Sequence, residues 1–136
     1  MSSYLTFYIV PKEEGSKPIS LISYSRNNEV YQYFNDSIRP AYVGNGDEIN
    51  YTELTVSHVD KVIEDLKCDI DKSKARLYEY EKYASGNLEI IEEIINQKDY
   101  INDLEGTLYQ IYCIRNIVEE STYDWNDYNK VLCNID

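Results

Sequence analysis

The sequence contains one histidine, His58, and histidine is the side chain most often used as a general base or a metal ligand. No serine or cysteine stands at a spacing that pairs it with His58 as a nucleophile. One histidine also cannot build a two-histidine zinc site or the paired Glu-x-x-His ligands of a di-iron bundle. His58 stands at the start of a long apolar-periodic stretch, so we expect it in the capping region of a helix. We predict no enzyme activity and no cofactor.

Three other motifs resemble ligand sites only in part. The run Asp69–Ser73 alternates acidic residues, but Lys74 stands where a calcium-binding loop needs glycine. The glycines of Gly44-Asn45-Gly46 lack the third glycine of a dinucleotide fingerprint, and no Gly-Lys-Ser/Thr triplet is present. Glu89 and Glu93 fall on a helix face that is expected to be open to water. Without a concave wall nothing raises their pKa, so we assign them no acid–base role.

The chain is strongly acidic, with 25 Asp and Glu against 13 Lys and Arg and a net charge of −12. From Gly86 to the last residue there are 3 basic and 11 acidic residues, which gives −8 for this stretch alone. Such a charge repels nucleic acid phosphates and anionic membranes, so we expect no direct nucleic acid binding and no membrane binding. The apolar stretch Tyr4–Val10 is too short for a signal core or a membrane span.

The three cysteines, Cys68, Cys113 and Cys133, form no Cys-x-x-Cys pair and are odd in number. This pattern favours reduced thiols over a disulfide framework. We therefore expect a cytoplasmic protein, or one inside a virion that is assembled there. The abundance of Tyr, Ile, Asn and Lys is typical of AT-rich bacterial and phage genomes.

Residues 1–54 are expected to form a small α+β head. Alternating apolar residues predict two strands that form a β-hairpin, and Ser25 is expected to cap a short helix that ends at Pro40. A turn and a third strand are predicted to follow. The predicted strands and turn are Tyr4–Val10, Ile19–Tyr24, Gly44–Asp47 and Ile49–Leu54.

Residues 55–121 are expected to form a long antiparallel helical hairpin with a coiled-coil seam. Ser57 with Asp60 suggests an N-terminal cap, and Gly86 with Asn87 fits a turn at 84–87 that ends one helix and caps the next. Apolar or small residues recur at alternating spacings of four and three in the first arm. They are Val59, Ile63, Leu66, Ile70, Ser73, Leu77, Tyr80 and Ala84; the second seam comprises Ile90, Ile94, Gln97, Ile101, Leu104, Leu108, Ile111, Arg115 and Val118.

The two seams specify a register. When the arms are placed antiparallel, the position numbers of facing seam residues add up to a nearly constant value. Leu66 should then face Leu104. The polar residues Ser73 and Gln97 should meet as one polar layer, which opposes sliding of the arms at some cost in stability. An alternative is that Ser73 only fills a small gap.

Residues 122–136 carry apolar side chains at helical spacing, at Tyr128, Val131, Leu132 and Ile135. This predicts a short C-terminal helix with an aromatic face that includes Trp125. The fold class is therefore expected to be α+β and mostly helical. Its length of 136 residues predicts a single domain.

The second arm is apolar beyond its seam, which is more than one partner helix can bury. We expect a structural or assembly subunit of a larger complex, such as a phage virion, that binds a protein partner or further copies of itself through this hairpin. The expected partner-binding residues are Ile91, Ile95, Tyr109, Tyr112, Ile117, Trp125 and Tyr128. We expect the head to cover the stretch from Tyr109 to Ile117, which leaves Ile91 and Ile95 for a partner. The alternative is that Trp125, Tyr128 and Leu132 of the C-terminal segment fold back over Ile91 and Ile95.

The alternative hypothesis is an acidic inhibitor that mimics nucleic acid and blocks a basic host enzyme, as anti-restriction or anti-CRISPR proteins do. The acidic residues after Gly86 motivate it. Mimicry of charge should weaken steeply with salt, whereas apolar assembly should not.

Overall fold

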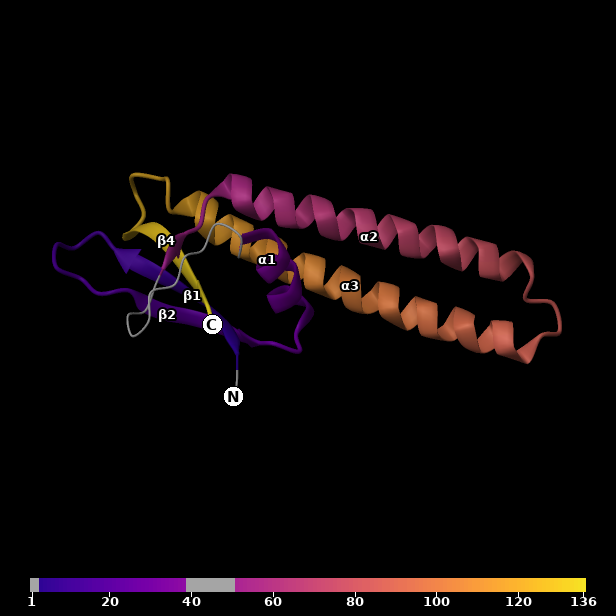
Figure 1. Ribbon diagram of the computed structural model, residues 1–136. Helices are drawn as coiled ribbons and strands as arrows, with labels where there is room; N and C mark the ends of the chain where they lie inside the picture. Colours follow the sequence, from indigo (N-terminus) through magenta and orange to yellow (C-terminus); the bar gives the residue numbers. More distant parts are fainter. Residues whose placement is uncertain (1–2, 39–50) are drawn as a thin grey trace.

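The computed structural model describes residues 3–38 and 51–136, and within them the chain forms an α+β fold of four strands and three helices (Figure 1). One end of the molecule, called the head from here on, holds the strands, helix α1 and the near ends of α2 and α3. The far ends of the two long helices project away from it. The elements in chain order are β1 Tyr4–Pro11, β2 Ile19–Ser25, α1 Glu29–Ile38, β3 Thr52–Glu53, α2 Val56–Lys82, α3 Leu88–Glu120 and β4 Tyr128–Ile135.

The four strands form one antiparallel sheet in the order β2-β1-β4-β3. Leu5 and Phe7 alternate with less buried residues along β1, so one face of the sheet is apolar. That face packs against α1, and the ring centroids of Phe7 and Phe34 are 5.2 Å apart with edge-to-face geometry. The predicted hairpin of the first two strands is confirmed.

The prediction of a C-terminal helix is wrong, because residues Tyr128–Ile135 form β4 in the middle of the sheet. Val131, Cys133 and Ile135 are buried at a period of two, which is the pattern of a strand. The segment also satisfies a helical spacing, so its own sequence is ambiguous. Pairing along the whole of β1 decides in favour of the strand, since β1 would otherwise lose a row of backbone hydrogen bonds.

Helix α2 begins at Val56 and is capped by Thr55, not by the predicted Ser57. The Thr55 hydroxyl accepts a hydrogen bond from the His58 backbone N–H, and His58 Nδ1 accepts one from the Thr55 N–H, each at 3.3 Å. This reciprocal pair is a capping box in which histidine takes the usual place of Glu or Gln. The capping role that was expected for His58 is thus confirmed.

The turn between the long helices follows the sequence prediction. Gly86 has a φ of +73°, which favours glycine, and the Asn87 side chain accepts hydrogen bonds from the Glu89 and Ile90 N–H groups at 3.0 and 3.3 Å. With 27 and 33 residues, α2 and α3 are about 40 and 50 Å long at 1.5 Å per residue.

The core joins the inner face of the sheet, α1 and the near parts of α2 and α3. Leu66 and Leu104 are both fully buried there. Ser73 is the last buried residue of α2, and Ile101 is the first buried residue of α3. Between these points every predicted seam residue is partly buried and the remaining residues are exposed; the seam residues are Leu77, Tyr80, Ala84, Ile90, Ile94 and Gln97.

The predicted contact between Ser73 and Gln97 is present, because Gln97 Nε2 donates to the Ser73 backbone carbonyl oxygen at 3.4 Å. Helix α1 is capped by Asn28, whose side chain accepts from the Val30 N–H at 2.9 Å, and not by the predicted Ser25. Of the predicted third strand Ile49–Leu54, the described residues form the strand β3 at Thr52–Glu53. The predicted turn at Gly44–Asp47 and the helix end at Pro40 lie outside the described residues.

Candidate interaction surface

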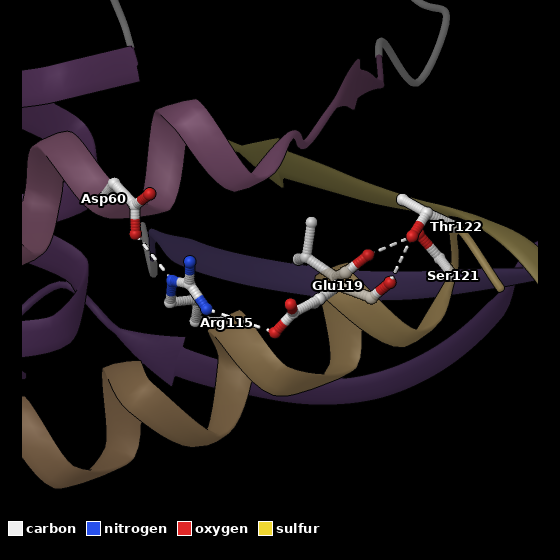
Figure 2. A network of polar contacts seen from close by, with 6 residues as sticks. Asp60, Arg115, Glu119, Ser121 and Thr122 are labelled. Carbon is white, nitrogen blue, oxygen red and sulfur yellow. Dashed lines mark hydrogen bonds and ion pairs between the residues drawn. The ribbon is translucent and has the colours of Figure 1, made fainter.

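The near ends of α2 and α3 are held together by a polar network (Figure 2). Arg115 of α3 donates from Nε to the Asp60 carboxylate of α2 at 2.6 Å and from Nη1 to the Glu119 carboxylate at 3.1 Å. The Asp60 carboxylate raises the pKa of the Arg115 guanidinium further. Ser121 and the neighbouring Thr122 donate to backbone carbonyls of the last turn of α3. These contacts fix the base of the helical pair, from which the far part extends.

Helix α3 carries a row of exposed apolar residues beside the seam, here called the outer stripe: Leu88, Ile91, Ile95, Tyr109 and Tyr112. Ile91 and Tyr109 are 18 residues apart, which is five helical turns. They therefore lie on the same side of α3, about 27 Å from one another. Ile95 is 54% exposed and Tyr109 is 72% exposed. On the same side of α3, Lys98, Asn102 and Glu105 separate Ile95 from Tyr109, so the outer stripe consists of two exposed apolar patches. Exposed apolar patches on a helix are a form of surface that binds protein partners.

A shallow groove of about 470 Å³ borders the outer stripe between α2 and α3. Tyr109 and Tyr112 line one side of it, and Lys67 and Lys74 line the other. The Lys67 Nζ lies 5.5 Å from the centre of the Tyr112 ring, and a hydrogen bond with the Tyr112 side chain raises the pKa of Lys67. Lys74 forms an ion pair with Glu105 at 3.3 Å. The groove therefore offers aromatic rings and both signs of charge.

The two lysines were missed by the sequence-based prediction, which named residues of the second arm and the C-terminal segment only. The sequence does contain a signal for them. The position numbers of Lys67 with Tyr112 and of Lys74 with Glu105 add up to the same total, as an antiparallel register requires. The α2 side of the groove could thus have been located by extending the register from the seam to its flank.

The structure places the predicted partner-binding residues in three regions. Ile91, Ile95, Tyr109 and Tyr112 lie on the outer stripe. Ile117 and Tyr128 belong to the head instead. Both pack against the core, and the Tyr128 hydroxyl donates to the Ile117 carbonyl oxygen at 2.9 Å. Trp125 is 73% exposed and stacks on Tyr123 in the segment between α3 and β4.

The expectation that the head covers the stretch from Tyr109 to Ile117 is only half right. Ile114 and Ile117 are covered, whereas Tyr109 stays exposed. The alternative, in which the C-terminal segment folds over Ile91 and Ile95, is wrong, because β4 is fixed in the sheet at the other end of the molecule (Figure 1).

Acidic side chains flank the far end of the outer stripe. Glu89, Glu92 and Glu93 are exposed, and none of the ion pairs among residues 3–38 and 51–136 involves them. Carboxylates that form no ion pair within the described part of the chain are available to a basic group on a partner. The stripe and these carboxylates together form an apolar contact with an acidic rim.

Other ionisable groups are held in structural positions. Burial raises the pKa of the Cys133 thiol to about 12, and burial together with a 2.7 Å hydrogen bond to Asp69 raises the pKa of the Tyr33 hydroxyl. In the described part of the chain, no group of three or more His, Cys, Asp or Glu side chains is placed to hold a metal ion. None of the described helices is long and apolar enough to cross a membrane.

No protein-family model, no curated protein and no solved structure matches this chain.

Proposed function

We propose that this chain is a protein-interaction subunit of a larger assembly and that it binds its partner through the outer stripe on the projecting part of the helical pair. The observation that carries the proposal is the exposure of Ile91 and Ile95 beside the partly buried Ile90 and Ile94. The seam residues Ile90 and Ile94 are the less exposed members of the same turns. Ile91 and Ile95 therefore contribute little to holding α2 and α3 together.

The finer description of this region is a coiled coil, in which α2 and α3 pack by knobs into holes along the heptad seam. The partial burial of alternate seam residues and the Ser73–Gln97 layer support it. A two-stranded coiled coil leaves the flanking positions open. A third helix from a partner can then lie against the outer stripe as a helix lies in a groove, with anchors one turn apart.

The expected partner carries Lys or Arg around an apolar contact. Glu89, Glu92 and Glu93 supply the complementary charge at the rim, where it sets association rate and orientation more than affinity. The apolar residues supply the affinity, because each Å² of apolar surface that is buried stabilises the complex by about 25 cal/mol. A virion or a similar assembly is the type of complex that we propose.

The test compares two double variants with the same chemistry on adjacent positions. Ile91→Ser with Ile95→Ser removes the stripe, whereas Ile90→Ser with Ile94→Ser removes part of the seam. We expect the stripe variant to keep its melting temperature and to lose incorporation into the native assembly. We expect the seam variant to melt earlier. If the stripe variant assembles normally, the proposal is wrong.

The second candidate, an inhibitor that mimics nucleic acid, has one observation in its favour, the unpaired acidic rim. Five carboxylates lie along about 21 Å of α3, from Glu89 to Asp103, which is about one per 5 Å. Duplex DNA carries one charge per about 1.7 Å. The density on α3 is about a third of that, and Lys98 lowers it further, so we place this candidate second. A partner affinity that falls by orders of magnitude between low and high salt would favour it.

A further inference from the structure

Strand β2 forms one edge of the sheet and lacks the usual features that protect an edge. Among the described residues its only strand neighbour is β1, so one side of its backbone has no strand partner there. None of the seven residues of β2 is charged. The opposite edge strand, β3, has two residues and carries Glu53. Edge strands of monomers are usually short or charged, because an open edge pairs with other strands.

A β-bulge turns the apolar residues of β2 toward α3. Phe7 pairs with Ile22 and Tyr8 with Ser20, so Leu21 is the extra residue. As a result Leu21 and Ile22 both line an apolar groove of about 380 Å³. They are still 44% and 41% exposed. The groove is completed by Tyr24 of β2 and by four residues of α3, which are Gln110, Cys113, Ile114 and Ile117. All seven lining residues are uncharged.

Charge identifies the occupant of this edge. From Lys12 to Glu29 the chain has three basic and three acidic residues, so this stretch is neutral in a protein of net charge −12. Two copies of so acidic a chain repel each other over most of their surface, but this edge brings no like charges together. A basic partner would gain nothing here, in contrast to the outer stripe with its acidic rim.

We propose that β2 pairs antiparallel with β2 of a second copy of this chain about a two-fold axis. The two sheets then become one continuous sheet, and Leu21 and Ile22 of both copies become buried between the two α3 helices. Such an interface is isologous, so each copy supplies the same strand and the same groove. The bulge restricts regular pairing to Ile22–Ser25, where β2 matches β1 without a shift. Burial of the groove must therefore contribute much of the affinity.

The test is the mass of the full chain in solution by sedimentation equilibrium, with a wild-type mass of twice the 16.0 kDa chain expected. Ser23 is exposed and its hydroxyl lies 2.9 Å from that of Thr6. Ser23→Lys brings two lysines together near the two-fold axis, and we expect it to weaken the dimer at least about tenfold with little change in melting temperature. Leu21→Lys should do the same by placing a charge in the groove.

The control is the stripe variant Ile91→Ser with Ile95→Ser, which should keep the dimer and lose only the assembly partner. Failure of one proposal is therefore distinguishable from failure of the other. A wild-type mass of one chain at about 100 µM overturns the inference, since an interface that binds so weakly would have little meaning. A dimer that survives both lysine substitutions overturns it as well, because the contact must then lie elsewhere.

Discussion

The boundary between the firmly packed and the projecting part of the helical pair gives the sharpest prediction. Leu66 is fully buried in the core that joins the sheet, α1 and both long helices. Leu66→Ala leaves a cavity there and should lower the free energy of unfolding by about 2 to 5 kcal/mol. At about 2.1 cal/mol/K per residue, a chain of 136 residues has an unfolding entropy of about 290 cal/mol/K, so the melting temperature should fall by about 7 to 17 °C.

Leu77 provides the matched comparison, because it is the same residue type in the same seam of α2 beyond the end of the core. Since Leu77 is only partly buried, Leu77→Ala should cost about 1 kcal/mol. Glu64→Ala, at an exposed position of α2, should cost less than about 0.5 kcal/mol. Thermal and urea unfolding of the three variants measure these values. Equal losses for Leu66→Ala and Leu77→Ala would refute the view that the head anchors only the near part of the pair.

Three further predictions concern a cap, a thiol and the polar layer. Thr55→Ala should lower the free energy of unfolding by about 1 kcal/mol because it removes the cap of α2, and Ser57→Ala should change it little; the opposite order in urea melts would restore the cap predicted from sequence. Cys133 should resist alkylation at pH 8 while the exposed Cys68 and, in the dissociated chain, Cys113 react, so the intact mass should show at most two additions and not three. Because the pKa of Cys133 is raised from 9.0 to about 12 in the folded state, the unfolded state loses its proton first, and this thiol should lower stability as the pH rises above about 9. Gln97→Leu should raise the melting temperature, since its hydrogen bond is long and the seam is otherwise apolar, and a clear fall would show that the polar layer stabilises the pair.

Local signals in the sequence were sufficient for the helical pair. Three signals each act over a few residues: the spacing of apolar residues, the positive φ of Gly86 and the Asn87 cap. They can therefore be recognised in the sequence without knowledge of the fold. The antiparallel register then follows from arithmetic, and the contact between Ser73 and Gln97 confirms it. The position of Ile91, Ile95 and Tyr109 on one side of α3 was predictable for the same reason.

Tertiary structure decided the features in which two local patterns compete. Residues Tyr128–Ile135 satisfy helical spacing and strand spacing together, and only the hydrogen bonds that β1 requires make them a strand. The same choice moved Tyr128 and Ile117 from the predicted surface into the head, since a strand in the middle of the sheet brings both against the core. The bulge that turns Leu21 toward α3 also depends on pairing with β1, a long-range contact that no local pattern in β2 specifies.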